Sequence, residues 1–285
     1  MRKSSILRIM ALALCVILSL GLLACGSSDN SAKTTASSGE NANPSGESKD
    51  LLARIRERGT LVIGTEGNWS PWTYHDEKDN LVGLDIEIGT KLAEKIGVKP
   101  DFQETDWDAI LAGVDSGRFD IACNGVGYTE ARAEKYNFST PYVYTHKVLV
   151  VSGDNEDIKK MEDLKGKTTA NSPGSTYAEI AESYGATVTS ASTLDQTIEL
   201  LLEGRVDATV NAQVSIEDYL SQHPDANIKV VQVLEGDPVA FPMQKTDDAK
   251  SLVDEVNKIL DEMRKDGSLK DISMKYFKLD LTKED

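Results

Sequence analysis

Short apolar runs alternate with stretches of helical periodicity from residue 50 to the end of the chain. The apolar runs predict strands at 61–63, 119–123, 147–151, 167–171, 207–210 and 228–233. Between them, apolar residues spaced along one helix face predict helices that start near residues 51, 86, 107, 176, 194 and 252. Glycines at 59, 97 and 267 are expected to end helices, and Asp106 is expected to cap one at its N-terminus. This alternation is typical of an α/β fold with mainly parallel sheets.

One pattern occurs twice. Residues 110–120 and 198–207 each read as an amphipathic helix, a Gly-Arg turn and a strand that opens with Asp. Two similar α/β lobes would explain the repeat, although common helix–turn–strand chemistry could also produce it. We favour two lobes.

The first 25 residues differ from the rest. Arg2, Lys3 and Arg8 precede an apolar run that is shorter than the roughly 20 residues of a membrane-spanning helix, as in a signal peptide. The run ends at Ala24-Cys25, which resembles the lipobox of bacterial lipoproteins. We therefore expect a signal peptide at 1–24, a lipid on Cys25 that anchors the exported protein to the outer face of the bacterial cell membrane, and a flexible polar tether at 25–49. Ordinary secretion with an incidental cysteine is the alternative.

Composition and charge limit the partners, metals and cofactors that the protein is expected to bind. The formal net charge is −16 and the basic residues form no stripe, which argues against a nucleic-acid partner. Cys15 would leave with the signal peptide and Cys25 would carry the lipid, so Cys123 is left alone, without an intrachain disulfide or a zinc site. The three histidines are scattered, and no cofactor or metal is expected.

Candidate binding residues follow the predicted strands. The turn Asn124–Gly127 ends one strand, and its glycines would let backbone N–H groups approach an anion. Arg132 follows it with a guanidinium suited to a carboxylate. Trp69 and Trp72 follow the first strand, and their rings would form a pocket wall, with core packing as the alternative.

Several segments carry a resemblance to a known family. They are 83–93, 129–132, 138–142, 164–167 and 263–267, and in this order they resemble the family 3 extracellular solute-binding proteins, the amino-acid receptors of ABC importers. The resemblance spans Leu51 to Phe277. It implies a two-lobed periplasmic-binding-protein fold of type II, with the ligand in the cleft between the lobes and two crossing strands as the hinge. We expect one lobe at 50–142 and 239–285 and the other at 143–238.

The same resemblance implies a set of ligand contacts. Arg132 would grip the α-carboxylate, and the turn at 173–176 would add hydroxyl and N–H donors. Many members of the family hold the α-ammonium with an aspartate where this chain has Ala212, so either Glu66 replaces it or the ligand is not a standard α-amino acid. The expected ligand-binding residues are Glu66, Trp69, Trp72, Trp107, Asn124, Gly125, Gly127, Arg132, Gly174, Ser175, Thr176 and Asn211.

Glu66-Gly67, Trp107-Asp108 and Asn124 resemble the cystine-binding branch of the family, with another polar amino acid as the alternative. The implied protein is a monomer that delivers its ligand to a membrane permease and its ATPase. It would not be an enzyme. A cyclic-acid dehydratase on the same scaffold, with Glu66 as its catalytic carboxylate, and an extracellular amino-acid sensor are the competing interpretations.

Overall fold

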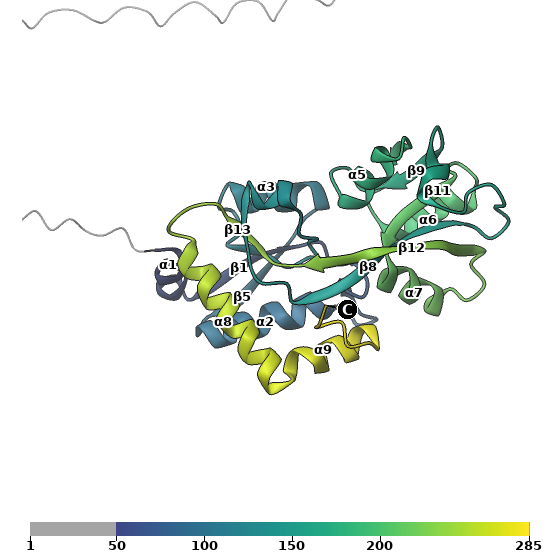
Figure 1. Ribbon diagram of the computed structural model, residues 1–285. Coiled ribbons are helices and arrows are strands. Elements are labelled where there is room, and N and C mark those ends of the chain that lie inside the picture. Colours follow the sequence, from purple (N-terminus) through teal and green to yellow (C-terminus); the bar gives the residue numbers. More distant parts are fainter. Residues whose placement is uncertain (1–49, 285) are drawn as a thin grey trace, which may run out of the picture. The chain divides into compact units, whose positions relative to one another are not determined.

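The computed structural model describes residues 50–284. The segments expected to form the signal peptide, the lipidated cysteine and the tether, residues 1–49, lie outside the described residues. The described chain forms two groups of helices and strands, called here the first and the second lobe (Figure 1). Two long strands, β8 (Val143–Ser152) and β12 (Ile228–Val239), run between them as an antiparallel pair.

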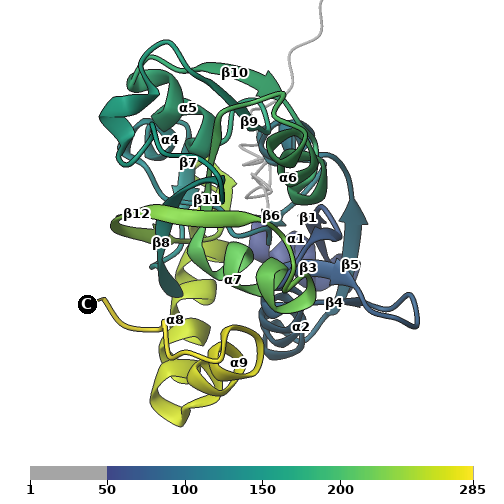
Figure 2. The same ribbon diagram turned by 90° about the vertical axis from the view of Figure 1, so that its right-hand side faces the viewer.

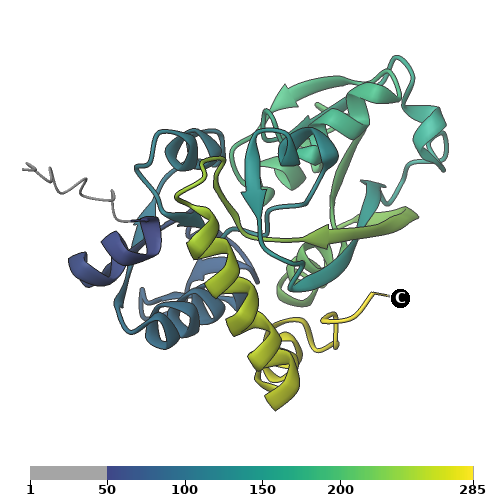
Figure 3. The same ribbon diagram turned by 60° about the vertical axis from the view of Figure 1, so that its left-hand side comes forward.

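The first lobe is built on a three-stranded parallel sheet in the order β5-β1-β6. Its strands are β1 (Thr60–Thr65), β5 (Lys99–Glu104) and β6 (Ile121–Ala122). Its helices are α1 (Leu51–Arg58), α2 (Leu84–Ile96), α3 (Trp107–Asp115), α4 (Glu130–Ala133), α8 (Lys250–Asp266) and α9 (Ser268–Phe277), of which Figure 3 brings α1, α8 and α9 forward. Two small antiparallel sheets complete it, one of β2 (Asn68–Trp69), β3 (Thr73–His75) and β4 (Leu81–Val82), the other of β7 (Tyr136–Phe138) and β13 (Pro242–Gln244).

The second lobe is built on a five-stranded sheet in the order β10-β9-β11-β8-β12 (Figure 2). Strands β9 (Thr168–Asn171), β10 (Thr187–Ser190) and β11 (Ala208–Ala212) are parallel to one another, and β8 runs antiparallel to β11. Its helices are α5 (Thr176–Ser183), α6 (Leu194–Leu202), α7 (Gln213–Gln222) and the 3₁₀ helix η1 (Met161–Leu164). The helix–turn–strand pattern that occurs twice in the sequence gives α3–β6 in the first lobe and α6–β11 in the second.

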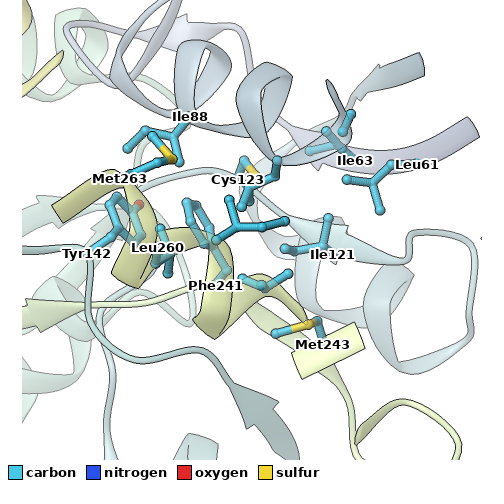
Figure 4. Close-up of a cluster of buried hydrophobic side chains, with 14 of the residues drawn as sticks. Leu61, Ile63, Ile88, Ile121, Cys123, Tyr142, Phe241, Met243, Leu260 and Met263 are labelled. Carbon is cyan, nitrogen blue, oxygen red and sulfur yellow. The ribbon is translucent and has the colours of Figure 1, made fainter. Parts of the chain in front are cut away.

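Each lobe has its own apolar core. In the first lobe, the buried face of α8 (Leu252, Val256, Ile259, Leu260 and Met263) packs with residues of α2 and of the parallel sheet (Figure 4). In the second lobe, successive residues of β8 point to opposite faces of the sheet, as a strand requires. Val148 and Val150 join one apolar cluster, and Leu149 and Val151 join the other. A sheet covered on both faces explains why 147–151 is apolar without alternation.

Helices begin and end at the capping residues expected from the sequence. The Asp50 carboxylate accepts a hydrogen bond from the Ala53 N–H at the start of α1, and Gly59 ends that helix with a φ of 76°. Gly97 and Gly267 also take positive φ values after α2 and α8. Asp106 does stand at the N-cap of α3, but its side chain makes no capping bond.

Two expectations about strands need correction. The strand expected at 119–123 is only two residues long, since the Phe119 N–H donates to the Gly113 carbonyl of α3 instead of to β1. The strand expected at 228–233 continues to Val239, since it pairs with β8 along its whole length. The lobe boundaries at 142 and 239 stay a prediction.

Asp85, which lies in the segment 83–93, has a structural role. Its carboxyl is fully buried and accepts hydrogen bonds from the Gly125 N–H at 2.6 Å and the Tyr142 hydroxyl at 2.7 Å. Burial raises the pKa of Asp85 to about 7. The contact fixes the backbone of the turn that begins at Asn124.

None of the helices within residues 50–284 has the length and apolar character needed to cross a membrane.

Cys123 is fully buried in the first-lobe core, and burial raises the pKa of its thiol (Figure 4). The thiolate is the reactive form, so we expect the native protein to react very slowly with Ellman's reagent and to release one thiol on unfolding. A chain that begins at Gly26 lacks Cys15 and Cys25 and isolates this thiol. Rapid modification of the native protein would contradict the prediction.

Candidate ligand-binding site

A cavity lies between the two lobes. Its volume not filled by protein atoms is about 590 Å³, including the part that is open to solvent. The first lobe contributes Glu66, Asn68, Trp69, Trp107, Gly125, Gly127 and Arg132. The second lobe contributes Asn171, Ser172, Ser175, Thr176, Tyr177, Ser192, Thr193, Leu194, Thr197 and Asn211. The lining contains one cationic side chain, one carboxyl, three aromatic rings and many neutral hydrogen-bonding groups, a composition suited to a small polar molecule.

Arg132 is the cation of the cavity. It stands on the short helix α4, whose N-cap Thr129 accepts a hydrogen bond from the Arg132 N–H. Its side chain is 8% exposed, and its guanidinium donates to the Gly127 carbonyl at 3.0 Å and to the Gly174 carbonyl at 3.1 Å. The guanidinium also lies over the Trp107 ring, 5.4 Å from its centre.

The guanidinium of Arg132 forms no ion pair with any carboxylate in the described part of the chain. Burial lowers the pKa of Arg132, although arginine remains charged at any physiological pH. A buried charge is costly unless an opposite charge compensates it. This charge makes the cavity suited to an anion.

Glu66 is the carboxyl of the cavity. It follows β1, and two hydrogen bonds tie it to Asn124: the Glu66 N–H donates to Oδ1 at 2.8 Å, and Nδ2 donates to the Glu66 carboxyl at 2.6 Å. Burial raises the pKa of Glu66 to about 7, and Asp106 and Asp108 act in the same direction against the hydrogen bond from Asn124. Near neutral pH this carboxyl can either ionise beside a cation or stay neutral.

The rings of Trp69 and Trp72 stack with their centres 5.4 Å apart. Trp69 lines the cavity, whereas Trp72 lies behind it with no exposed surface, and its Nε1–H donates to Ser215 of α7 at 3.2 Å. The expectation that Trp72 lines the pocket is therefore wrong, because the ring is a core anchor. Both rings press on Gly125, where a Cβ would come within 2.7 Å of Trp69, so this turn needs glycine.

On the opposite wall, Ser175 and Thr176 start helix α5. The Ser175 hydroxyl caps the helix by accepting from the Ala178 N–H. The N-terminus of a helix favours negative charge because its first N–H groups lack intrahelical partners. This wall and the Arg132 guanidinium, which are joined by the bond to Gly174, are suited to the same anion.

The structure brings together most of the expected residues. Those that line the cavity are Glu66, Trp69, Trp107, Gly125, Gly127, Arg132, Ser175, Thr176 and Asn211. Trp72, Asn124 and Gly174 do not: Asn124 is fully buried and holds Glu66, and Gly174 presents only its carbonyl to Arg132. Ala212 is buried in the first-lobe apolar cluster and offers no polar group.

One lining residue of the first lobe and part of the second-lobe lining were not predicted from the sequence. The missed lining residues are Asn68, Asn171, Ser172, Tyr177, Ser192, Thr193, Leu194 and Thr197. Asn171 ends a strand that was predicted, so the rule that ligands bind at the carboxyl ends of parallel strands could have found it. Ser192 and Thr193 follow β10, whose polar sequence gave no strand signal.

Within residues 50–284, no group of three or more His, Cys, Asp or Glu side chains is arranged to hold a metal ion.

Residues 61–279 match the bacterial extracellular solute-binding proteins, family 3. The chain belongs to this family. It is 40% identical over 275 residues to the L-cystine-binding protein TcyA of Bacillus subtilis, covering 95% of this chain and 98% of that protein. It is 32% identical over 236 residues to the L-cystine-binding protein TcyJ of Escherichia coli K12, covering 82% of this chain and 88% of that protein.

Among solved structures, an ancestral arginine-binding protein bound to arginine superimposes with a TM-score of 0.72. It is 36% identical and covers 77% of this chain and 99% of its own. The two-lobed α/β fold expected for the family is thereby confirmed. The relatives are named as binding proteins and not as enzymes, so this family 3 protein is a binding component of amino-acid ABC transport.

The raised pKa of Glu66 predicts a pH-dependent cost to stability. Its folded-state pKa is about 7 against an ordinary value of 4.5, so the fold favours the protonated form. Stability from this group is present below pH 4.5 and is lost as the pH rises towards 7. Between pH 5 and pH 8, Glu66→Gln should gain about 2–3 kcal/mol in free energy of unfolding relative to the unmodified protein.

Urea denaturation of both proteins at several pH values measures this difference. Glu94→Gln, which changes an exposed carboxylate on α2, is the matched control and should follow the unmodified protein. A Glu66→Gln difference that does not change with pH would show that the Glu66 carboxyl is ionised in the fold throughout this range.

Proposed function

We propose that this protein is the substrate-binding lipoprotein of an ABC importer and that it captures a polar amino acid, with cystine favoured. The two lobes close around the ligand, and the closed form delivers it to a membrane permease that an ATPase drives. The observation that carries the proposal is the Arg132 guanidinium, which is buried in the cavity between carbonyl oxygens and forms no ion pair with a carboxylate of the described residues.

The geometry around Arg132 favours an α-carboxylate as the anion. Two guanidinium donors are used by Gly127 and Gly174, which leaves three of its five N–H groups for a ligand. The hydroxyls of Ser175 and Thr176 stand at the N-terminus of α5 on the facing wall. A small carboxylate between these groups would satisfy the buried charge from both lobes at once.

The rest of the lining supports a ligand with a second polar end. Glu66 lies near the Trp69 ring, and the cavity also holds Asn68 and Trp107. Cystine carries an amino-acid group at each end of a disulfide, so one end can meet Arg132 while the ammonium of the other meets Glu66. Trp69 would cover the apolar middle. Two relatives that this chain resembles over most of its length are named as L-cystine-binding proteins.

Contacts between the lobes support closure as the mechanism. Arg132 of α4 donates to Gly174 beside α5, and Trp72 donates to Ser215 of α7. The edge of the Trp69 ring meets Tyr177, with 6.4 Å between ring centres. Pairing of β8 with β12 gives two strands between the lobes, a connection that permits hinge bending.

Calorimetry with L-cystine, each standard amino acid and L-cystine dimethyl ester tests the ligand class. We expect tight binding of free cystine and none of the ester. Arg132→Ala should lose roughly 30-fold to several thousand-fold in affinity, as for removal of one member of a buried charge pair. Arg132→Lys should recover only part of this, because an ammonium cannot reproduce the planar fork. Arg118→Ala, which removes an exposed arginine stacked on Phe119, is the control.

Unchanged affinity in Arg132→Ala, or binding of the ester as tight as that of the free acid, would refute the carboxylate site. Binding of another amino acid in place of cystine would keep the transport role and change the ligand.

We also propose attachment to the outer face of the cell membrane through a lipid on Cys25. An apolar run that ends at Ala24-Cys25 and continues as a polar segment supports it. Durable attachment needs two lipid signals, such as two acyl chains, and lipoproteins carry both on this cysteine. Cells that produce the full chain should incorporate labelled palmitate into the protein and retain it with membranes. Cys25→Ser should abolish both, whereas Cys123→Ser should change neither.

A further inference from the structure

We propose that Asn171 is a specificity-determining residue of the cavity, whose side-chain oxygen accepts a hydrogen bond from the α-ammonium of the bound amino acid. This inference rests on the proposed function, since it concerns the same cavity. It assigns the ligand's amino group to a neutral amide on the second lobe.

The first observation is an unsatisfied acceptor. Asn171 is 2% exposed and lines the cavity, and its Oδ1 has no hydrogen-bond partner among residues 50–284. Buried side-chain oxygens are nearly always paired, and each exception calls for an explanation. A buried acceptor left without a donor destabilises the protein. A ligand group that donates to Asn171 would remove this destabilisation.

The orientation of the amide is fixed by its other end. Nδ2 donates to the Val210 carbonyl at 2.7 Å and to the Thr209 hydroxyl at 3.2 Å, both on β11. Rotating the amide by half a turn would place Oδ1 against the Val210 carbonyl, and two acceptors cannot share a hydrogen bond. Oδ1 therefore points away from β11, and the residue that carries it forms part of the cavity wall.

The position of Asn171 selects the α-ammonium over other donors. Asn171 ends β9, and the same turn then supplies the Gly174 carbonyl bound by Arg132 and the Ser175 and Thr176 groups at the start of α5. A carboxylate held by these groups lies beside the turn. In an α-amino acid the ammonium is separated from the carboxylate by a single carbon, so it is the donor placed nearest to Asn171.

The charges of the cavity are consistent with this assignment. Glu66 is the only carboxyl among the cavity-lining residues that the structure describes, and it stands on the first lobe after β1. It is therefore available for a second cationic group. Asn171 offers the α-ammonium an oxygen on the other wall, and hydrogen bonds from charged donors are stronger than neutral ones.

A cycle of two ligands and two proteins tests the contact. The ligands are L-cystine and 3,3′-dithiodipropionate, which keeps both carboxylates and the disulfide but lacks both amino groups. Asn171→Leu should weaken binding of cystine by roughly 10- to 150-fold, the range for one hydrogen bond to a charged group. It should leave binding of dithiodipropionate unchanged within about twofold, since that ligand has no ammonium for Asn171. Glu66 is present in both proteins, so its contribution to the affinity for each ligand cancels when the two proteins are compared.

Thr169→Val is the matched control. Thr169 lies on the same strand, and its buried hydroxyl oxygen also has no partner in the described part of the chain, but it does not line the cavity. This variant should bind both ligands like the unmodified protein. If Asn171→Leu fails to fold, Asn171→Ala takes its place in the same cycle.

The outcomes separate this inference from the proposed function. If Asn171→Leu weakens both ligands by the same factor, or the unmodified protein binds dithiodipropionate as tightly as cystine, the ammonium contact is refuted and the binding function stands. If the unmodified protein binds L-arginine and not cystine, the cycle is run with L-arginine and 5-guanidinopentanoate, and the same two results decide it. If it binds no amino acid at all, the proposed function fails and this inference fails with it.

Discussion

The Arg132 guanidinium is a full positive charge inside the protein, and the geometry of the cleft depends on how that charge is compensated. Within the described residues it bonds to the Gly127 carbonyl of its own lobe and the Gly174 carbonyl of the other, with the Trp107 ring beside it. Carbonyl dipoles solvate a cation only in part. The part of the charge that remains uncompensated favours an anion between the lobes.

Buried polar contacts fix the positions of the first-lobe residues that line the cavity. The Asp85 carboxyl binds the Gly125 N–H, and Asn124 holds both the backbone and the carboxyl of Glu66. Position 125 accepts only glycine, because a Cβ there would collide with the Trp69 and Trp72 rings. These groups lie behind the cavity surface or at its edge. They hold the site in position before a ligand arrives, which reduces the entropy cost of binding.

Much of the fold could be predicted from the sequence, because its signals are local. The periodicity of apolar residues predicted α8, and glycines at 59 and 97 predicted where α1 and α2 end. The glycine-rich turn before Arg132 indicated an anion site. Where the signal was weak, prediction failed. The polar strand β10 has no apolar run to identify it. Phe119 lies outside its expected strand, since its N–H donates to the Gly113 carbonyl of α3.

The sequence by itself determined the family, the α/β alternation and the side chains that could bind an amino acid, since these depend on residue type and short spacing. Only the tertiary structure decided which of them share a cavity. It buried Trp72 behind Trp69, turned Asn124 into a support for Glu66, and placed Asn171 with an unpaired oxygen beside the Arg132 site. The physical reason is that the cavity wall joins residues from two lobes, and their contacts depend on the packing of segments far apart in the chain.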